Sequence, residues 1–261
     1  VVDANVSKTP AGHKDRPASC FGERLHMDFN FTRASSVNYN KDKNMKRVVQ
    51  SRQGYSATLT IIDKKTRKKF AFPTAGKSPP LQIVKAFLDR YKTSNGRTRF
   101  IRTDQGGELA RSAKFRELLL SQNCILEPTG SDAPSENGMA ERPNDTIVSM
   151  TRRLLYLSGL PPKFWADALL YSVYIYNRTV HSAIGMTPHE AHTGNKPDLS
   201  RLRVFGSRVL CKVPGKRTSK LDHYIYKGIF IGYGATDKHI RYIDSVTSRE
   251  KTATHAVFDE A

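Results

Sequence analysis

The sequence predicts a mixed α/β domain followed by a small β-barrel, and two patterns support this prediction. Between residues 23 and 177, three strand-like runs are followed by helix-like and strand-like runs in alternation. From residue 204 onward, four short β-like runs, over residues 204–213, 226–234, 239–245 and 254–260, are separated by Gly, Pro and Lys turns. We therefore expect a linker or arm over residues 1–22, an α/β core of strands flanked by helices over residues 23–195, and a barrel over residues 196–261.

The first expected strand covers residues 23–31. Apolar Leu25 and Met27 alternate there with polar residues, and this period of two is typical of a strand with one buried face. The alternation places Asp28 on the face opposite the apolar side chains. The next stretch, residues 32–53, is basic and lacks an apolar pattern, so we expect a loop that is either disordered or in contact with DNA.

The other core elements follow from turn-forming residues and apolar spacing. Residues 128–138 are almost all turn formers, so we expect a loop before the next helix. Pro143 cannot donate a helical hydrogen bond, which predicts that this helix begins near residues 140–143 or is distorted there. The expected elements are strands over residues 55–63, 68–73, 99–103 and 124–127 and helices over residues 81–91, 112–123, 139–156 and 162–177.

Composition favours a nucleic-acid partner. The chain has 261 residues and a formal net charge of +19. Residues 1–100 hold 21 basic and 7 acidic side chains, residues 101–200 hold 10 and 11, and residues 201–261 hold 12 and 6. Basic outer segments around a nearly neutral middle are expected if the flanks bind phosphate and the middle holds an acidic metal site.

Other features limit the setting of the protein. Cys20, Cys124 and Cys211 are far apart, so we expect neither a disulfide framework nor a Cys-based zinc site, and a reducing compartment fits. The sequence has no apolar run long enough for a membrane span and no signal peptide, so we expect no membrane partner. Because the chain begins with Val1 rather than Met, we expect a fragment of a longer polypeptide.

Three acidic residues are the candidate metal ligands. Asp28 lies within an apolar strand, Asp104 ends a strand before a Gly-Gly turn, and Glu141 begins a helix after a flexible loop. Ligands gather at strand ends of α/β sheets, and carboxylate oxygens suit Mg²⁺ or Mn²⁺. Each acid taken singly is also typical of a solvated surface. Taken together, the three predict a divalent-metal site that acts on a polyanion.

Five segments occur in a specific order: TDQGGE, NGMAER, FWADALLYSVYIYNR, TPHEAHTGNKPDLSRLRVFG and KLDHYIYKGIFIGYG. Together they resemble the integrase region of copia-type LTR retrotransposon polyproteins. The resemblance implies a catalytic core with a ribonuclease H-like fold, followed by a small SH3-like barrel. It also implies a DDE triad, which by motif match falls on Asp28, Asp104 and Glu141.

The resemblance further implies the reaction and its partners. Two Mg²⁺ or Mn²⁺ ions, with Asp28 between them, Asp104 on one and Glu141 on the other, would activate an attacking oxygen and stabilise a leaving oxygen. Water would trim the 3′ ends of the element's cDNA, and the exposed 3′-hydroxyl would then attack target double-stranded DNA. Joining two ends implies a homo-oligomer, a dimer or tetramer, that acts in the nucleus after passage through the cytoplasm.

Neighbouring acids are weaker candidates for the metal site. Glu108 lies four residues after Asp104 and is an accompanying acid in the family motif. Glu136 stands where the resemblance leads us to expect Gln. Asp145 is one helical turn beyond the predicted catalytic Glu and could share its face.

Several basic residues are candidate DNA contacts. Arg142 adjoins the predicted catalytic Glu. A basic run over residues 64–69 is more typical of a solvated turn. Tyr233 and its neighbouring tyrosines in the tail either stack on bases or belong to the barrel core. The tail residues expected to bind phosphate are Lys212, Lys216, Arg217 and Lys220.

Two alternatives compete with the integrase function. One is a ribonuclease H-like nuclease or transposase of another lineage, against which the barrel-like tail and the order of the segments argue. The other is a catalytically inactive DNA-binding remnant of a retroelement polyprotein. The presence of acids at all three predicted positions argues against that remnant.

Overall fold

The computed structural model describes residues 18–31, 49–76, 78–90, 98–104, 108–129, 134–212, 225–234 and 236–260, apart from the side chains of residues 30–31, 128–129 and 134–144. The chain forms two compact units, which are described separately. The first unit comprises Val1–Phe29, Leu59–Phe72 and Lys77–Ala140. The second comprises Asn30–Thr58, Pro73–Gly76 and Glu141–Ala261.

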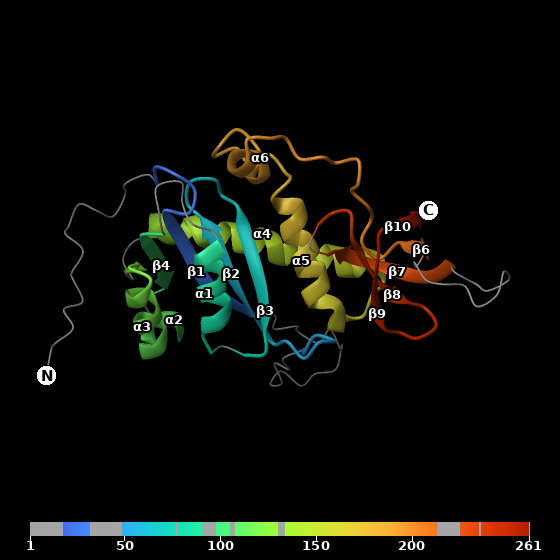
Figure 1. Ribbon diagram of the computed structural model, residues 1–261, viewed down its shortest axis with the longest axis horizontal. Coiled ribbons are helices and arrows are strands. Elements are labelled where there is room, and N and C mark those ends of the chain that lie inside the picture. Colours follow the sequence, from blue (N-terminus) through green and yellow to red (C-terminus); the bar gives the residue numbers. More distant parts are fainter. Residues whose placement is uncertain are drawn as a thin grey trace, which may run out of the picture. The chain divides into compact units, whose positions relative to one another are not determined.

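A mixed five-stranded sheet forms the centre of the α/β part of the chain (Figure 1). Its strands are β1 (Arg24–Phe31), β2 (Ala57–Asp63), β3 (Lys69–Thr74), β4 (Phe100–Asp104) and β5 (Ile125–Thr129). Their spatial order is β3-β2-β1-β4-β5. β1 pairs in parallel with β4, and β4 pairs in parallel with β5. All five predicted strands are therefore present, with ends that differ by one or two residues.

The two faces of β1 differ as the alternation predicts. Leu25 and Met27 are each 1% exposed, whereas Asp28, on the opposite face, is half-buried. The apolar residues of the unit come from both strands and helices. For example, the rings of Phe70 in β3 and Phe87 meet edge to face with their centroids 5.0 Å apart.

Three helices accompany these strands: α1 (Leu81–Arg90), α2 (Glu108–Arg111) and α3 (Ala113–Ser121). α3 begins where predicted because Ser112 is its N-cap and accepts a hydrogen bond from the Phe115 amide at 3.2 Å.

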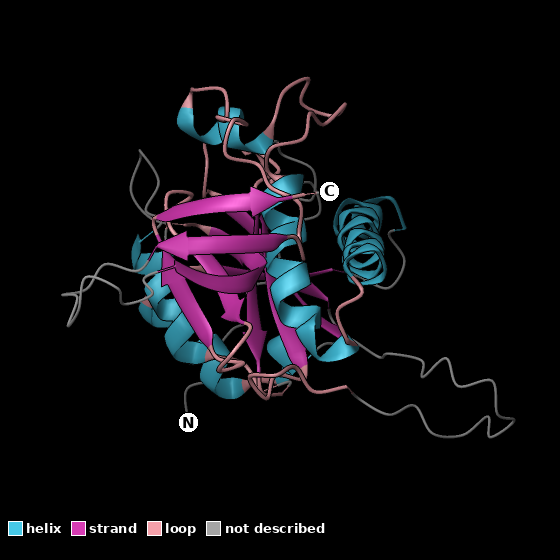
Figure 2. Ribbon diagram, turned by 90° about the vertical axis from the view of Figure 1, so that its right-hand side faces the viewer, coloured by secondary structure: helices cyan, strands magenta, loops and turns pink. Residues whose placement is uncertain are grey.

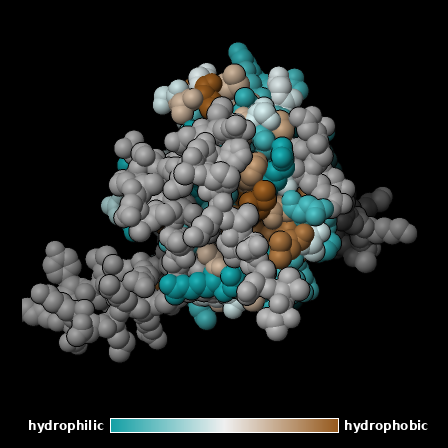
Figure 3. Space-filling view, turned by 90° about the vertical axis from the view of Figure 1, so that its left-hand side faces the viewer, coloured by the Kyte–Doolittle hydropathy of each residue, from teal (hydrophilic) through white to brown (hydrophobic). Residues whose placement is uncertain are grey.

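Figure 3, which faces the left-hand side of Figure 1, shows hydrophobic residues in small areas between hydrophilic ones.

Helix α4 (Pro134–Ser158) corrects two predictions. It begins at Pro134, so residues 134–138 are helical rather than part of a loop. It also continues through Pro143, so the predicted start near residues 140–143 is wrong. Pro134 is the first helical residue, where a proline loses no hydrogen bond, whereas an internal proline such as Pro143 costs about 3 kcal/mol. Within the described part of the chain, neither α4 nor another helix is long and apolar enough to cross a membrane.

The second unit combines helices with an antiparallel five-stranded sheet (Figure 2). A 3-10 turn, η1 (Pro162–Phe164), leads into α5 (Trp165–Tyr176), and α6 (Pro188–Thr193) follows. The sheet has the order β10-β6-β7-β8-β9. Its strands are β6 (Arg208–Lys212), β7 (Ile225–Tyr233), β8 (Ile240–Asp244), β9 (Glu250–Ala253) and β10 (His255–Asp259). The sequence patterns predict four of these strands but miss β9 and α6.

Helix α5 and the second sheet share one hydrophobic core. Ala168 and Tyr171 of α5 belong to the same buried cluster as Phe230 of β7 and Tyr242 of β8. The rings of Tyr171 and Phe230 meet edge to face, with centroids 5.7 Å apart. This part of the helix and the sheet are therefore packed as one body.

Asp167 of α5 is the centre of an ionic network within the same unit. Its side chain is only 1% exposed. Arg241 of β8 places Nη2 at 2.6 Å from Asp167 Oδ1, and Arg52 places Nε at 3.1 Å from Oδ2. Glu250 of β9 accepts hydrogen bonds from both arginines. The network joins α5 to β8, β9 and the segment that precedes β2.

Replacing Asp167 by Asn should destabilise the protein, because Asp167 is the buried acid of the network and the two half-buried arginines would keep only Glu250 as a counter-charge. Breaking a buried ion pair costs about 3–5 kcal/mol, which corresponds to a fall of roughly 10 °C in the thermal unfolding midpoint. The matched control is Asp89→Asn, which breaks an exposed pair with Lys85 and should change stability by less than about 0.5 kcal/mol. Equal effects of the two substitutions would contradict the role of the network.

Candidate metal centre

Strand pairing brings Asp28 and Asp104 to the same level of the first sheet. In the parallel pair of β1 and β4, His26 lies opposite Arg102. Continuing two residues along both strands places Asp28 opposite Asp104. Neighbouring strands lie about 4.8 Å apart, and side chains at one level of a parallel sheet share a face. The two carboxylates are therefore neighbours on one face, at the end of β4.

The electrostatics of Asp28 support this placement. Burial is the main cause that raises the pKa of Asp28 from its ordinary value of 3.8 to about 6. The negative charges of Asp104 and Glu108 raise this pKa further, while the positive charge of Lys69 lowers it. Glu108 is the first residue of α2, so the helix adds a third carboxylate to the surroundings of Asp28.

This concentration of carboxylates fits a divalent cation. A cation would relieve the repulsion between the carboxylates, and hard oxygen ligands suit Mg²⁺ or Mn²⁺. Asp28 and Asp104 fit two positions of the predicted ligand set. Glu141 lies on α4, but its side chain is outside the described residues, so the third position remains a prediction. Among the described side chains, no group of three His, Cys, Asp or Glu residues is arranged to hold a metal ion.

Lys69 is a member of this site that sequence reasoning misses. The basic run over residues 64–69 predicts a solvated turn, but Lys69 is the first residue of β3 and its side chain is only 1% exposed. Its positive charge lowers the pKa of Asp28. The signal that could have identified Lys69 is its position at the start of the apolar segment KFAF, inside the strand rather than in the turn.

Buried charges lie on the same face before the carboxylates: Arg102, opposite Glu127, is two residues before Asp104, and Arg24 is four residues before Asp28. Arg24 Nη2 lies 3.0 Å from Glu127 Oε1, and Arg102 Nη2 lies 3.6 Å from Glu127 Oε2. All three side chains are less than a tenth exposed. Burial and the neighbouring positive charges, Arg102 first among them, lower the pKa of His26 to about 3, so this imidazole is neutral. These contacts link β1, β4 and β5 directly beneath the carboxylates.

The structure describes only part of the predicted DNA-binding set. Lys212 is the last residue of β6 and is exposed. Arg142 lies on α4, and its side chain is outside the described residues. Lys216, Arg217 and Lys220 also lie outside them. The roles of these residues stay predictions.

Comparisons with known proteins agree with both parts of the fold. Residues 207–261 match the family model of the retroviral polymerase SH3-like domain. Over 82% of its length, the chain is 32% identical to the retrovirus-related Pol polyprotein from transposon TNT 1-94 of Nicotiana tabacum. It is 27% identical over 81% of its length to the corresponding polyprotein from transposon RE1 of Arabidopsis thaliana. The matched regions cover 16% and 14% of these relatives, so the chain corresponds to a small part of each polyprotein.

A solved structure has a similar fold. A chain of the simian T-cell lymphotropic virus intasome, determined in complex with PP2A regulatory subunit B56 gamma, aligns with a TM-score of 0.51 and 14% identity. The alignment covers 91% of this chain and 78% of that one. This likeness and the SH3-like match agree with the predicted fold, a ribonuclease H-like core followed by an SH3-like domain. With the two plant relatives, they show that the chain belongs to the integrase region of copia-type LTR retrotransposon Pol polyproteins.

Replacing Asp28 by Asn should stabilise the metal-free protein above pH 6. The ionised carboxylate is disfavoured in the folded state, because its folded pKa, about 6, is above the ordinary value of 3.8. The ionised Asp28 carboxylate therefore destabilises the folded wild type fully above pH 6 and not at all below pH 4. We expect a gain on the order of 2 kcal/mol at pH 8 in EDTA, measured by urea unfolding, and none at pH 3.5.

The matched control for this measurement is Asp145→Asn. Asp145 is an exposed residue of α4, so the same chemical change should leave stability unaltered at both pH values. A loss of stability in Asp28→Asn at pH 8, or an equal gain at both pH values, would contradict the charged environment described for Asp28.

Proposed function

We propose that this chain is a divalent-metal-dependent integrase that carries out 3′-end processing and strand transfer, inserting element cDNA into host DNA. The single observation that carries the proposal is the placement of Asp28 and Asp104 side by side on adjacent strands. Membership of the integrase region and the net charge of +19 support it, because the substrate of this chemistry is a polyanion.

Asp28, Asp104 and Glu141 would hold the metal ions, of which the family resemblance implies two. When bound, Mg²⁺ or Mn²⁺ would supply charge stabilisation to an attacking and a leaving oxygen. The residues of the chain prepare this site. Above pH 6 the Asp28 carboxylate is ionised, and Lys69 holds positive charge close to it.

Both reactions are displacements at phosphorus. In processing, a water oxygen bonds to the phosphorus and the bond to the 3′ oxygen breaks, which leaves a free 3′-hydroxyl on the cDNA. In strand transfer, that hydroxyl oxygen bonds to a target phosphorus and the target's own 3′ oxygen leaves. In each step the attacking oxygen loses a proton and the leaving oxygen gains one, so no external oxidant or energy source is required.

The second unit offers surfaces for the DNA partners. Arg208 and Lys212 of β6 and Lys227 of β7 are exposed on neighbouring strands, where they can bind phosphates of cDNA ends or target DNA. Insertion of two cDNA ends requires two active sites, which supports a homo-oligomer, a dimer or tetramer. The similar fold in a viral intasome agrees with such an assembly. Action on host DNA places the working protein in the nucleus, after passage through the cytoplasm.

Strand transfer with pre-cut donor ends tests the proposal. The wild type should join donor to target DNA with Mg²⁺ and not with EDTA. Asp104→Asn and Glu141→Gln should reduce joining to the background, because each removes a charged metal ligand. Asp145→Asn, an exposed acid of α4, should retain wild-type joining.

The outcomes separate the competing functions. Undiminished joining by Asp104→Asn would refute the assigned site. Salt-sensitive DNA binding by the wild type without Mg²⁺-dependent joining would instead favour the inactive DNA-binding remnant. Cleavage of RNA–DNA hybrids without joining would favour a related ribonuclease H-like nuclease.

A further inference from the structure

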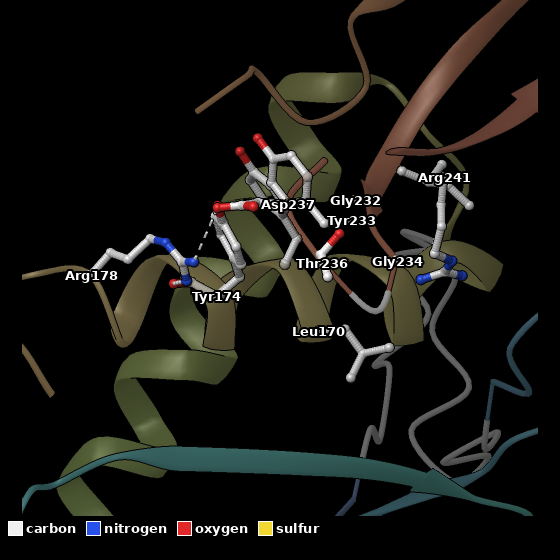
Figure 4. A pocket seen from close by; sticks show the side chains of 11 residues that line it. Leu170, Tyr174, Arg178, Gly232, Tyr233, Gly234, Thr236, Asp237 and Arg241 are labelled. Carbon is white, nitrogen blue, oxygen red and sulfur yellow. Dashed lines mark hydrogen bonds and ion pairs between the residues drawn. The ribbon is translucent and has the colours of Figure 1, made fainter. Parts of the chain in front are cut away.

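A cleft of about 500 Å³ lies between α5 and the turn that joins β7 to β8 (Figure 4). Leu170 and Tyr174 line it from one face of α5, and Arg178 lines it from the turn that follows the helix. Tyr233 and Asp237 line it from the other wall. All these residues belong to the second unit, whereas Asp28 and Asp104 belong to the first.

Arg178 has hydrogen-bonding capacity to spare. Its side chain is 15% exposed, and its Cζ lies 3.5 Å from the centre of the Tyr174 ring. Nη1 donates to the Tyr174 carbonyl at a long 3.4 Å, and Nη2 lies 4.0 Å from Asp237 Oδ2, beyond hydrogen-bond range. Nε is buried and has no hydrogen-bond partner among the described residues. A buried guanidinium of this kind is suited to an anion.

The walls of the cleft are aromatic. The rings of Tyr174 and Tyr233 lie with their centroids 4.4 Å apart. The Tyr174 hydroxyl is buried and, within the described part of the chain, forms no hydrogen bond. Burial raises the pKa of Tyr174 to about 12, so the hydroxyl is neutral and can donate to an acceptor. Gly232 leaves the facing wall without a side chain.

Asp237 occupies the place that an external anion would take. Its carboxylate is 30% exposed and only weakly engaged, at 4.0 Å from Arg178. Figure 4 shows Arg178 and Arg241 on opposite sides of the cleft, with Leu170 and Thr236 between them. An anionic group at Arg178 and a planar apolar group beside Leu170 would therefore fit together. A nucleotide has both parts, and clefts of this size accept ligands of that size.

We propose that this cleft binds one unpaired nucleotide of a DNA end, with its phosphate on Arg178 in place of Asp237 and its base between Leu170 and the tyrosines. The proposal rests on the proposed function only in naming DNA as the ligand. It predicts a preference for ends with single-stranded overhangs over blunt ends.

The test is a binding measurement in EDTA, which leaves metal chemistry out. Two duplexes are compared by fluorescence anisotropy with the full chain: one blunt and one with a two-nucleotide 5′ overhang that contains 2-aminopurine. The wild type should bind the overhang duplex about tenfold more tightly, as expected for one stacked base, and should quench the 2-aminopurine. Arg178→Gln should remove this preference while leaving its affinity for the blunt duplex within about twofold.

Asp237→Asn should change the preference for the overhang duplex in the opposite direction to Arg178→Gln. Among the described residues, it removes only the long ion pair with Arg178, at 4.0 Å. It should increase the preference for the overhang, because the competing carboxylate is gone. Two controls remove the same charges outside the cleft: Arg152→Gln, at an exposed position of α4, and Asp259→Asn, at an exposed position of β10, should shift both affinities equally.

Three results would overturn the proposal: equal affinity of the wild type for both duplexes, a preserved preference in Arg178→Gln, or a uniform shift in Asp237→Asn like that of Asp259→Asn. A protein that shows the preference but no Mg²⁺-dependent joining would support this cleft and contradict the catalytic proposal. Mg²⁺-dependent joining without the preference would support the catalytic proposal and contradict this cleft.

Discussion

The parallel pairing of β1 with β4 is the constraint on which the candidate site depends. It sets Asp28 level with Asp104, two residues beyond the observed pair of His26 and Arg102. A slip of one residue in either strand would send one carboxylate to the opposite, apolar face. The burial of Leu25 and Met27 on that face opposes such a slip, because it would expose both to the polar side. Packing of the core and placement of the acids are thus fixed together.

The face of the sheet that carries Asp28 also carries buried charged residues, which a hydrophobic core does not require. Glu127 lies between two arginines from neighbouring strands, and all three side chains are buried. Buried ion pairs rarely stabilise a fold more than apolar residues of similar size would. Their contacts have directional geometry, however, and they link the three strands β1, β4 and β5 before the carboxylates. Lys69 adds positive charge beside Asp28 from another strand. Charged residues from the four strands β1, β3, β4 and β5 therefore surround the two acids.

The sequence predicts the local parts of this arrangement and misses the parts set by distant contacts. Period-two alternation identifies the face of Asp28, and the strand end identifies Asp104. The level at which β1 and β4 pair depends on the whole sheet, so no local pattern reveals it. For the same reason, the burial of Lys69 and the partners of Asp167 are not predictable from their neighbours. The sequence mispredicts the start of α4, because the residues from Pro134 onward are typical turn formers and nevertheless lie in a helix that continues through Pro143.

The most direct test of the central claim is metal binding itself, measured without DNA. Mn²⁺ added to the metal-free protein can be followed by electron paramagnetic resonance, since bound Mn²⁺ loses the signal of the free ion. The account predicts binding by the wild type and by Asp145→Asn, and a weakening of at least tenfold in Asp28→Asn and Asp104→Asn. Equal binding by all four proteins would contradict the claim that Asp28 and Asp104 form a metal centre.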